Sequence, residues 1–231
     1  MAIYGAIRTI VGLVGSFFSL ALFLAPAPTI LDIVANRAVE DYSPWPYFAT
    51  FINCLLWFFY RLPFVHPGSF LVLPVNMFGV LLQLIYIVVF ILCANNPNQR
   101  RTLIAIFILE LMFFVLVVVL VLSCVRSQET RSTIVGILCI IFGILMYASP
   151  LSALISVTRT ENLSYMPLMP SLTNLANGIC WTIYYSIKFS LYMVIPSAIG
   201  IVISVFELII YARIYFKVRY PKPQPETEQE R

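Results

Sequence analysis

Apolar residues along this chain fall into long runs that are separated by short polar segments. Seven such runs are present, at approximately residues 9–34, 43–62, 69–94, 102–125, 132–157, 164–187 and 191–218. The hydrocarbon core of a bilayer requires about 20 predominantly apolar residues per helical span. The pattern therefore predicts an all-α integral membrane protein with seven transmembrane helices.

Composition supports the membrane assignment, because 61% of the 231 residues are hydrophobic and only 10% are charged. Soluble domains are about half apolar and about a quarter charged. Lys and Arg number nine on the side that holds the C-terminus and five on the opposite side. The positive-inside rule then predicts a cytoplasmic C-terminus and an extracellular N-terminus. Residues 219–231 are rich in proline and charged residues, a composition that predicts a disordered cytoplasmic tail.

Prolines interrupt two of the apolar runs in similar surroundings. The first is Pro26 in "LFLAPAP" and the second is Pro150 in "MYASPL", 124 residues later. A proline inside a helix removes a hydrogen bond and clashes with the preceding turn, at a cost of about 3 kcal/mol. Pro28 has no such partner, since Ser152 stands at the matching position, and we assign it local bending.

The same spacing relates other parts of the two halves. The pattern Asn-x3-Trp-x2-Tyr occurs at residues 53–60 and again at residues 177–184, also 124 residues apart. Residues 76–79 read Asn-x2-Gly, and residues 197–200 read Ser-x2-Gly. An internal repeat at this length indicates two copies of one structural unit.

The repeat predicts three parts and a tail: a first three-helix unit at 5–96, a linker helix at 100–127 and a second three-helix unit at 130–218. Three spans reverse the direction of the chain, so the linker helix allows both units to lie parallel. Two parallel repeats related by an axis along the membrane normal are a transporter architecture. Their substrate site is expected near the midplane, between the two units.

Four short motifs resemble those of the SWEET family of sugar transporters, in the eukaryotic seven-span form, with the plant hexose-type members most similar. They are "NCLLW" at 53–57, "ASPLS" at 148–152, "YMP" at 165–167 and "WTIY" at 181–184. The resemblance covers roughly residues 5–218, and this family is an example of parallel repeats.

The resemblance implies roles for individual residues of this chain. The substrate-binding positions that it implies are Asn76, Ser197, Trp181, Trp57, Cys54 and Met146. The hinge prolines that it implies are Pro26, Pro46, Pro150 and Pro167. The extracellular gate that it implies consists of Tyr60 and Tyr184.

This chain departs from the usual family residues at several of these places. Ser197 replaces a common asparagine, and Trp57 stands where a small residue is frequent. Arg61 and Tyr185 stand where glycines often follow the gate tyrosines. A bulky Met146 is associated with hexose-type members, and Trp57 would narrow the cavity further, which favours a monosaccharide.

The chemistry of these residues fits a neutral sugar. Asn76 and Ser197 can hydrogen-bond hydroxyl groups, and the two tryptophans offer flat faces for stacking against a sugar ring. The same residue types also join membrane helices to one another. We interpret Asn53 and Asn177 in that second way, as links between helices.

We therefore expect a bidirectional facilitative sugar uniporter that moves a small sugar, a hexose, by alternating access. The alternative is a proton-coupled PQ-loop-like transporter of another small solute, because Glu110 and Glu207 are ionisable residues within spans. The Pro-Gln signature of that class is absent, since Pro46 precedes Tyr47 and Pro167 precedes Leu168.

Other classes fit the pattern less well. A seven-helix receptor gives no reason for a three-plus-three repeat, and an intramembrane enzyme would need paired acids or a Ser–His pair within the spans. We expect no enzymatic activity, no cofactor and no metal. The resemblance implies a homo-oligomer in contact with membrane lipid. We expect the plasma membrane, with the vacuolar membrane as the alternative.

Overall fold

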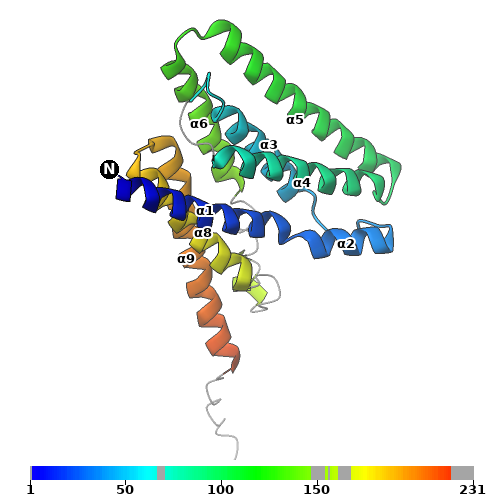
Figure 1. The fold of residues 1–231 in the computed structure, drawn as a ribbon. Helices are drawn as coiled ribbons and strands as arrows, with labels where there is room; N and C mark the ends of the chain where they lie inside the picture. Colours follow the sequence, from blue (N-terminus) through cyan, green and yellow to red (C-terminus); the bar gives the residue numbers. More distant parts are fainter. Residues whose placement is uncertain (1, 67–70, 147–153, 156, 161–167, 220–231) are drawn as a thin grey trace, which may run out of the picture.

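The computed structural model describes residues 2–66, 71–146, 154–155, 157–160 and 168–219. Within these ranges every long regular element is an α-helix. The helices are α1 (Ala2–Leu24), α2 (Ala27–Asn36), α3 (Trp45–Tyr60), α4 (Val72–Leu92), α5 (Pro97–Cys124), α6 (Gln128–Met146), α8 (Leu168–Ile187) and α9 (Leu191–Arg219). Figure 1 shows their arrangement.

These helices confirm the seven predicted spans. Five stretches of the described chain are long and apolar enough to cross a bilayer, and the first of them runs through α1 and α2 together. The other two spans are α3, which has 16 residues, and α8, whose 20 residues include several Asn, Ser and Thr. Polar residues lower the hydropathy of α8, and three of them, Ser171, Asn174 and Asn177, line the cavity described below.

The first span is two helices rather than one. Helix α1 ends at Leu24, and α2 begins at Ala27 with Pro26 as its N-cap. Pro28 lies in the first turn of α2, where a missing N–H leaves no hydrogen bond unmade. The break lies at Pro26, which caps α2, and the local bend assigned to Pro28 stays a prediction.

Six of the helices contact one another in a closed ring. Helix α1 packs on α4 and α8, α3 packs on α4 and α6, and α9 packs on α6 and α8. In the repeat of the sequence, α1 corresponds to α6, α3 to α8 and α4 to α9. The contact of α1 with α8 then maps onto the contact of α6 with α3. Both contacts are present, as a pseudo-two-fold axis requires.

Helix α5 lies outside this ring, along α3, α4 and α6 (Figure 1). Its exposed apolar side chains include Leu109, Met112, Val115, Leu116 and Val119. A row of such residues suits contact with lipid tails. The non-repeated helix therefore joins the two units and leaves the space between them free.

Glycines allow helices within and between the units to approach closely, as small residues commonly do in membrane proteins. A Cβ at Gly178 of α8 would lie 2.9 Å from Cγ1 of Ile201 and 3.2 Å from the carbonyl oxygen of Ser197, both on α9. The second of these atoms belongs to the backbone, which cannot rotate away. Gly178 is thus required for the packing of α8 against α9.

We predict that Gly178→Ala lowers stability by about 1–3 kcal/mol, because the added methyl group must push α9 away. The measurement is the midpoint of thermal unfolding in detergent. Gly5→Ala is the matched control, since nothing lies within 4 Å of a Cβ at Gly5 and both substitutions raise helix propensity equally. Equal midpoints for the two variants would contradict the prediction.

Candidate functional site

A cavity of about 510 Å³ lies between the two units. Its described lining comes from helices of both units and from Pro26, and α5 contributes no residue to it. Cavities that bind small molecules typically measure about 300–1,000 Å³. The position agrees with the place where parallel repeats are expected to bind substrate.

Most of the substrate-binding positions suggested by sequence line this cavity. They are Asn76, Ser197, Trp181, Trp57 and Met146. Cys54 is not among the lining residues: it is 1% exposed, and its Sγ would be 2.7 Å from a Cβ at Gly79. Pro26 and Pro46 also line the cavity. Pro150 and Pro167 lie outside the described residues.

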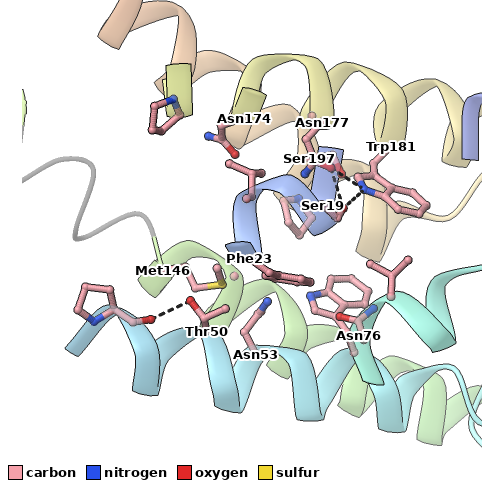
Figure 2. A pocket seen from close by; sticks show the side chains of 18 of the residues that line it. Ser19, Phe23, Thr50, Asn53, Asn76, Met146, Asn174, Asn177, Trp181 and Ser197 are labelled. Atoms are coloured by element: carbon pink, nitrogen blue, oxygen red, sulfur yellow. Dashed lines mark hydrogen bonds between the residues drawn. The ribbon is translucent and has the colours of Figure 1, made fainter. Parts of the chain in front are cut away.

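Trp181 is fixed by hydrogen bonds that join the two units (Figure 2). Its Nε1 donates to Oγ of Ser19 and to Oδ1 of Asn177, each at 3.0 Å. Ser19 Oγ in turn donates to Asn177 Oδ1 at 2.8 Å. Since Ser19 lies on α1 and Asn177 on α8, Asn177 does link two helices, in agreement with the sequence interpretation.

The equivalent place in the other half is incomplete. The 124-residue offset pairs each of these residues with one in the other half. Ser19 corresponds to Gly143, Asn177 to Asn53 and Trp181 to Trp57. Gly143 has no hydroxyl group, and Asn53 Oδ1 is buried without a hydrogen-bond partner in the described structure. A Cβ at Gly143 would lie 3.7 Å from this oxygen. Asn53 therefore lines the cavity, as Figure 2 shows, while its unpaired Oδ1 is covered by neighbouring protein atoms.

This role of Asn53 differs from the sequence interpretation of a link between helices. Comparing the two repeats position by position shows that Gly143 stands where the other copy has Ser19, but it does not show which residue that serine binds. The pairing of the asparagines with residue 19 or residue 143 is visible only in the folded chain.

Other polar side chains of the cavity also retain acceptors. Asn76 Nδ2 donates to the carbonyl oxygen of Val72 at 2.9 Å, and Ser197 Oγ donates to that of Met193 at 3.0 Å. Each side chain uses a donor on its own helix and keeps oxygen lone pairs. Gln83, which sequence reasoning missed, is 3% exposed, and its Oε1 has no partner within the described residues.

The two gate tyrosines occupy equivalent places beside the tryptophans. The rings of Trp57 and Tyr60 are 5.6 Å apart at 83°, and those of Trp181 and Tyr184 are 5.4 Å apart at 82°. Tyr60 is 0% exposed and Tyr184 is 2% exposed. Neither lines the cavity in this structure. They belong to a packed layer beyond it, which we term the tyrosine end of the bundle, where α3 and α8 finish.

A histidine in the loop after α3 supports this layer. The ring of His66 stacks on that of Tyr60 at 4.8 Å, and its Nδ1 is 2.7 Å from Ser132 Oγ. Burial, followed by the positive charges of Arg61 and Lys188, lowers the pKa of His66 from 6.5. His66 is therefore neutral at pH 7, and its uncharged ring can pack on Tyr60.

One of the two intramembrane glutamates belongs to the cavity. Glu207 lines it, is 5% exposed and is hydrogen-bonded to Ser171. Glu110 is half-buried on α5, outside the cavity. Across the described part of the chain, no three His, Cys, Asp or Glu residues come close enough together to hold a metal ion.

Comparisons with known proteins agree with this geometry. The family model described as "Sugar efflux transporter for intercellular exchange" matches the chain twice, over residues 9–98 and 133–219. The segment between the two matches contains nearly all of α5.

Curated plant proteins are similar over nearly the whole chain. Bidirectional sugar transporter SWEET4 of Oryza sativa subsp. indica is 46% identical, with 91% of this chain and 81% of that protein covered. SWEET7b of Oryza sativa subsp. japonica is 41% identical, with 96% and 82% covered. SWEET5 of Arabidopsis thaliana is 39% identical, with 96% and 92% covered.

A solved structure of a eukaryotic SWEET transporter, determined at 3.7 Å resolution, has a TM-score of 0.88 to this chain at 30% identity. It covers 92% of this chain, and 99% of the solved chain is matched. Repeat, cavity, relatives and fold lead to the same conclusion: this chain belongs to the SWEET family of membrane sugar transporters and is not an enzyme.

Proposed function

We propose that this protein is a facilitative uniporter that carries a hexose in both directions by alternating access. The observation that carries the proposal is the cavity between the two units, which aromatic side chains and polar Asn, Ser, Thr and Gln side chains line together. The relatives named as bidirectional sugar transporters support the substrate class.

The unused acceptors favour a ligand rich in donors. Asn53 Oδ1 and Gln83 Oε1 are buried without partners in the described structure, and a buried unpaired polar atom costs about 1–3 kcal/mol. Both oxygens are covered in this structure, and sugar hydroxyls would donate to them once the two amide side chains turn toward the cavity, while Trp57 and Trp181 would pack on the sugar ring. A uniporter must also release its substrate, so we expect weak binding in the millimolar range, about −4 kcal/mol.

The bulky lining supports a monosaccharide over a disaccharide. Trp57, Trp181 and Met146 all line the cavity, and together they leave less room than smaller residues would. Substrate hydroxyls would then reach Asn76 and Ser197 on α4 and α9, in the middle of the bundle.

Alternating access would use the break at Pro26. Because α1 and α2 are separate helices that meet there, the end of the bundle beyond Pro26 can tilt without breaking further hydrogen bonds. Pro46 lies in the first turn of α3, where it sets the start of the helix. The matching hinges in the second unit would be Pro150 and Pro167.

We assign the tyrosine end to the outside and the C-terminus to the cytoplasm, on the distribution of Lys and Arg. We further propose the plasma membrane and a homo-oligomer, on the family resemblance. Glycosylation mapping at the tyrosine end and the molar mass of the purified protein in detergent test orientation and assembly. A monomeric mass, or glycan added at the opposite end, would overturn the respective assignment.

Proton coupling is the second candidate mechanism, and Glu207 favours it. An ionisable residue within a membrane span is a functional candidate by default, and this one lines the cavity. Hydrogen bonding to Ser171 gives Glu207 an alternative structural role. An imposed pH gradient distinguishes the two mechanisms. A proton-coupled transporter would use it to accumulate sugar against the sugar concentration gradient, whereas a uniporter would not.

We predict that proteoliposomes of the purified protein take up labelled glucose or fructose faster than sucrose. Asn76→Ala should reduce hexose uptake about tenfold, the equivalent of 1.4 kcal/mol in substrate stabilisation. Uptake should be unchanged by a pH gradient. Absence of flux for every hexose would contradict the proposed function, and gradient-driven accumulation that Glu207→Gln abolishes would favour proton coupling.

We predict that Gly143→Ser weakens hexose transport by occupying the free acceptor of Asn53. The serine Cβ fits, since its contacts would be 3.6 Å to Pro196 and 3.7 Å to Asn53 Oδ1, and its hydroxyl would copy the Ser19–Asn177 pair. The half-saturation concentration should rise about three- to tenfold. Gly143→Ala is the matched control and should change it little; equal effects of both variants would show a steric cause.

We predict that Pro26→Ala slows flux several-fold, because the restored N–H at residue 26 can bond to the carbonyl oxygen of Leu22 and stiffen the junction between α1 and α2. Pro28→Ala is the matched control, since Pro28 lies in the first turn of α2. Hexose flux per inserted protein is the measurement. Comparable flux for both variants and the wild type would contradict a hinge at Pro26.

A further inference from the structure

Arg61 packs against its own equivalent in the second repeat. The residue 124 positions after Arg61 is Tyr185. The guanidinium carbon of Arg61 lies 5.3 Å from the centroid of the Tyr185 ring. Two positions that a two-fold rotation exchanges can touch only where they approach the rotation axis. Arg61 and Tyr185 therefore lie near the pseudo-two-fold axis, and Tyr185 is also part of the cavity lining.

These residues form the layer that closes the cavity at the tyrosine end. Tyr185 and Met193 are part of the cavity lining, and Arg61 lies behind them with 7% of its surface exposed. A sugar that moves along the axis through this end must pass the position of the guanidinium group.

The contacts of the guanidinium join the two units without any negative charge. It lies over the ring of Tyr60 at 5.5 Å and over that of Tyr185 at 5.3 Å, within the range of a cation–π interaction. One Nη donates to the sulfur of Met193. Arg61 and Tyr60 belong to the first unit, whereas Tyr185 and Met193 belong to the second.

The hydrogen bonding of this cation is incomplete. Arg61 Nε is buried without a partner among the described residues. The guanidinium hydrogen-bonds to Tyr185, which is uncharged, and to the thioether of Met193, which is a weak acceptor. Burying a cation without a carboxylate costs more hydration than two ring faces return. Opening the tyrosine end would rehydrate the guanidinium, so its charge favours the open state while its ring contacts favour the closed one.

We propose that Arg61 is a positioning residue that sets the equilibrium between closed and open states of the tyrosine end. The rings of Tyr60 and Tyr185 hold the closure together, and the buried charge makes it easy to release. The assignment of this closure to the outer face rests on the proposed function.

Charge and ring contacts are tested separately by two substitutions with opposite expected effects. Arg61→Met removes the charge and keeps an unbranched apolar side chain, so the closed state should gain. Tyr185→Leu removes a ring and keeps apolar bulk, so the open state should gain. Arg61→Lys keeps a cation at the same place and is the matched control.

The first measurement is the half-saturation concentration for hexose entry from each side in oriented vesicles. The apparent affinity on one side falls with the fraction of protein open to that side. Arg61→Met should raise the outer-to-inner ratio of half-saturation concentrations about tenfold, Tyr185→Leu should lower it, and Arg61→Lys should stay within about threefold of the wild type. Equal shifts for Arg61→Met and Arg61→Lys, or unchanged ratios for both Arg61→Met and Tyr185→Leu, would overturn the proposal.

The second measurement needs no sugar. Cys139 is 0% exposed and belongs to the same packed cluster as Tyr60, Tyr185 and Met193. Its labelling by a membrane-impermeant maleimide, identified by mass spectrometry of the peptide, should slow in Arg61→Met and accelerate in Tyr185→Leu. Identical labelling rates of Cys139 in Arg61→Met and Tyr185→Leu would overturn the proposed role of Arg61. If the labelling rates differ as expected but the protein carries no hexose, only the proposed function would be overturned.

Discussion

Two copies of a three-helix unit can lie parallel across a bilayer only if one more helix runs between them, because three spans reverse the chain. Helix α5 satisfies this constraint, and it packs outside the ring, against α3, α4 and α6. The space between the units therefore stays open as a cavity of about 510 Å³. The site, its closing layer and the pseudo-two-fold axis all depend on this placement, since without it the second unit would be inverted.

The two halves of the site are related by symmetry but differ in their hydrogen bonds. Trp181 is held by Ser19 and Asn177, whereas the same place beside Trp57 has a glycine, Gly143, and an unpaired Asn53 oxygen. If the two halves were identical, the asparagine beside each tryptophan would have the same hydrogen-bond partners in both. In one half hydrogen bonds hold the tryptophan in place, and in the other half an acceptor has no partner in the described structure.

Several polar groups of this protein are stabilised by partners other than opposite charge. Arg61 lies between two tyrosine rings, Arg8 lies 4.5 Å from the centroid of the Tyr184 ring, and Glu207 is hydrogen-bonded to Ser171. Contacts of this kind hold an ionisable group more weakly than a buried ion pair with good geometry. Weak contacts suit the proposed alternating access, because each closure would have to be reversible.

The sequence by itself determined the spans, the repeat and the family, since long apolar runs and a recurring Asn-x3-Trp-x2-Tyr pattern are local properties of the chain. It also identified Asn76, Ser197 and both tryptophans, which line the cavity. Only the tertiary structure decided that Cys54 packs behind the cavity wall, that Asn53 is unpaired and that Arg61 meets Tyr185. The physical reason is that these facts depend on contacts between helices that are distant in the chain, and a repeat pattern specifies equivalence between positions but not which of them touch.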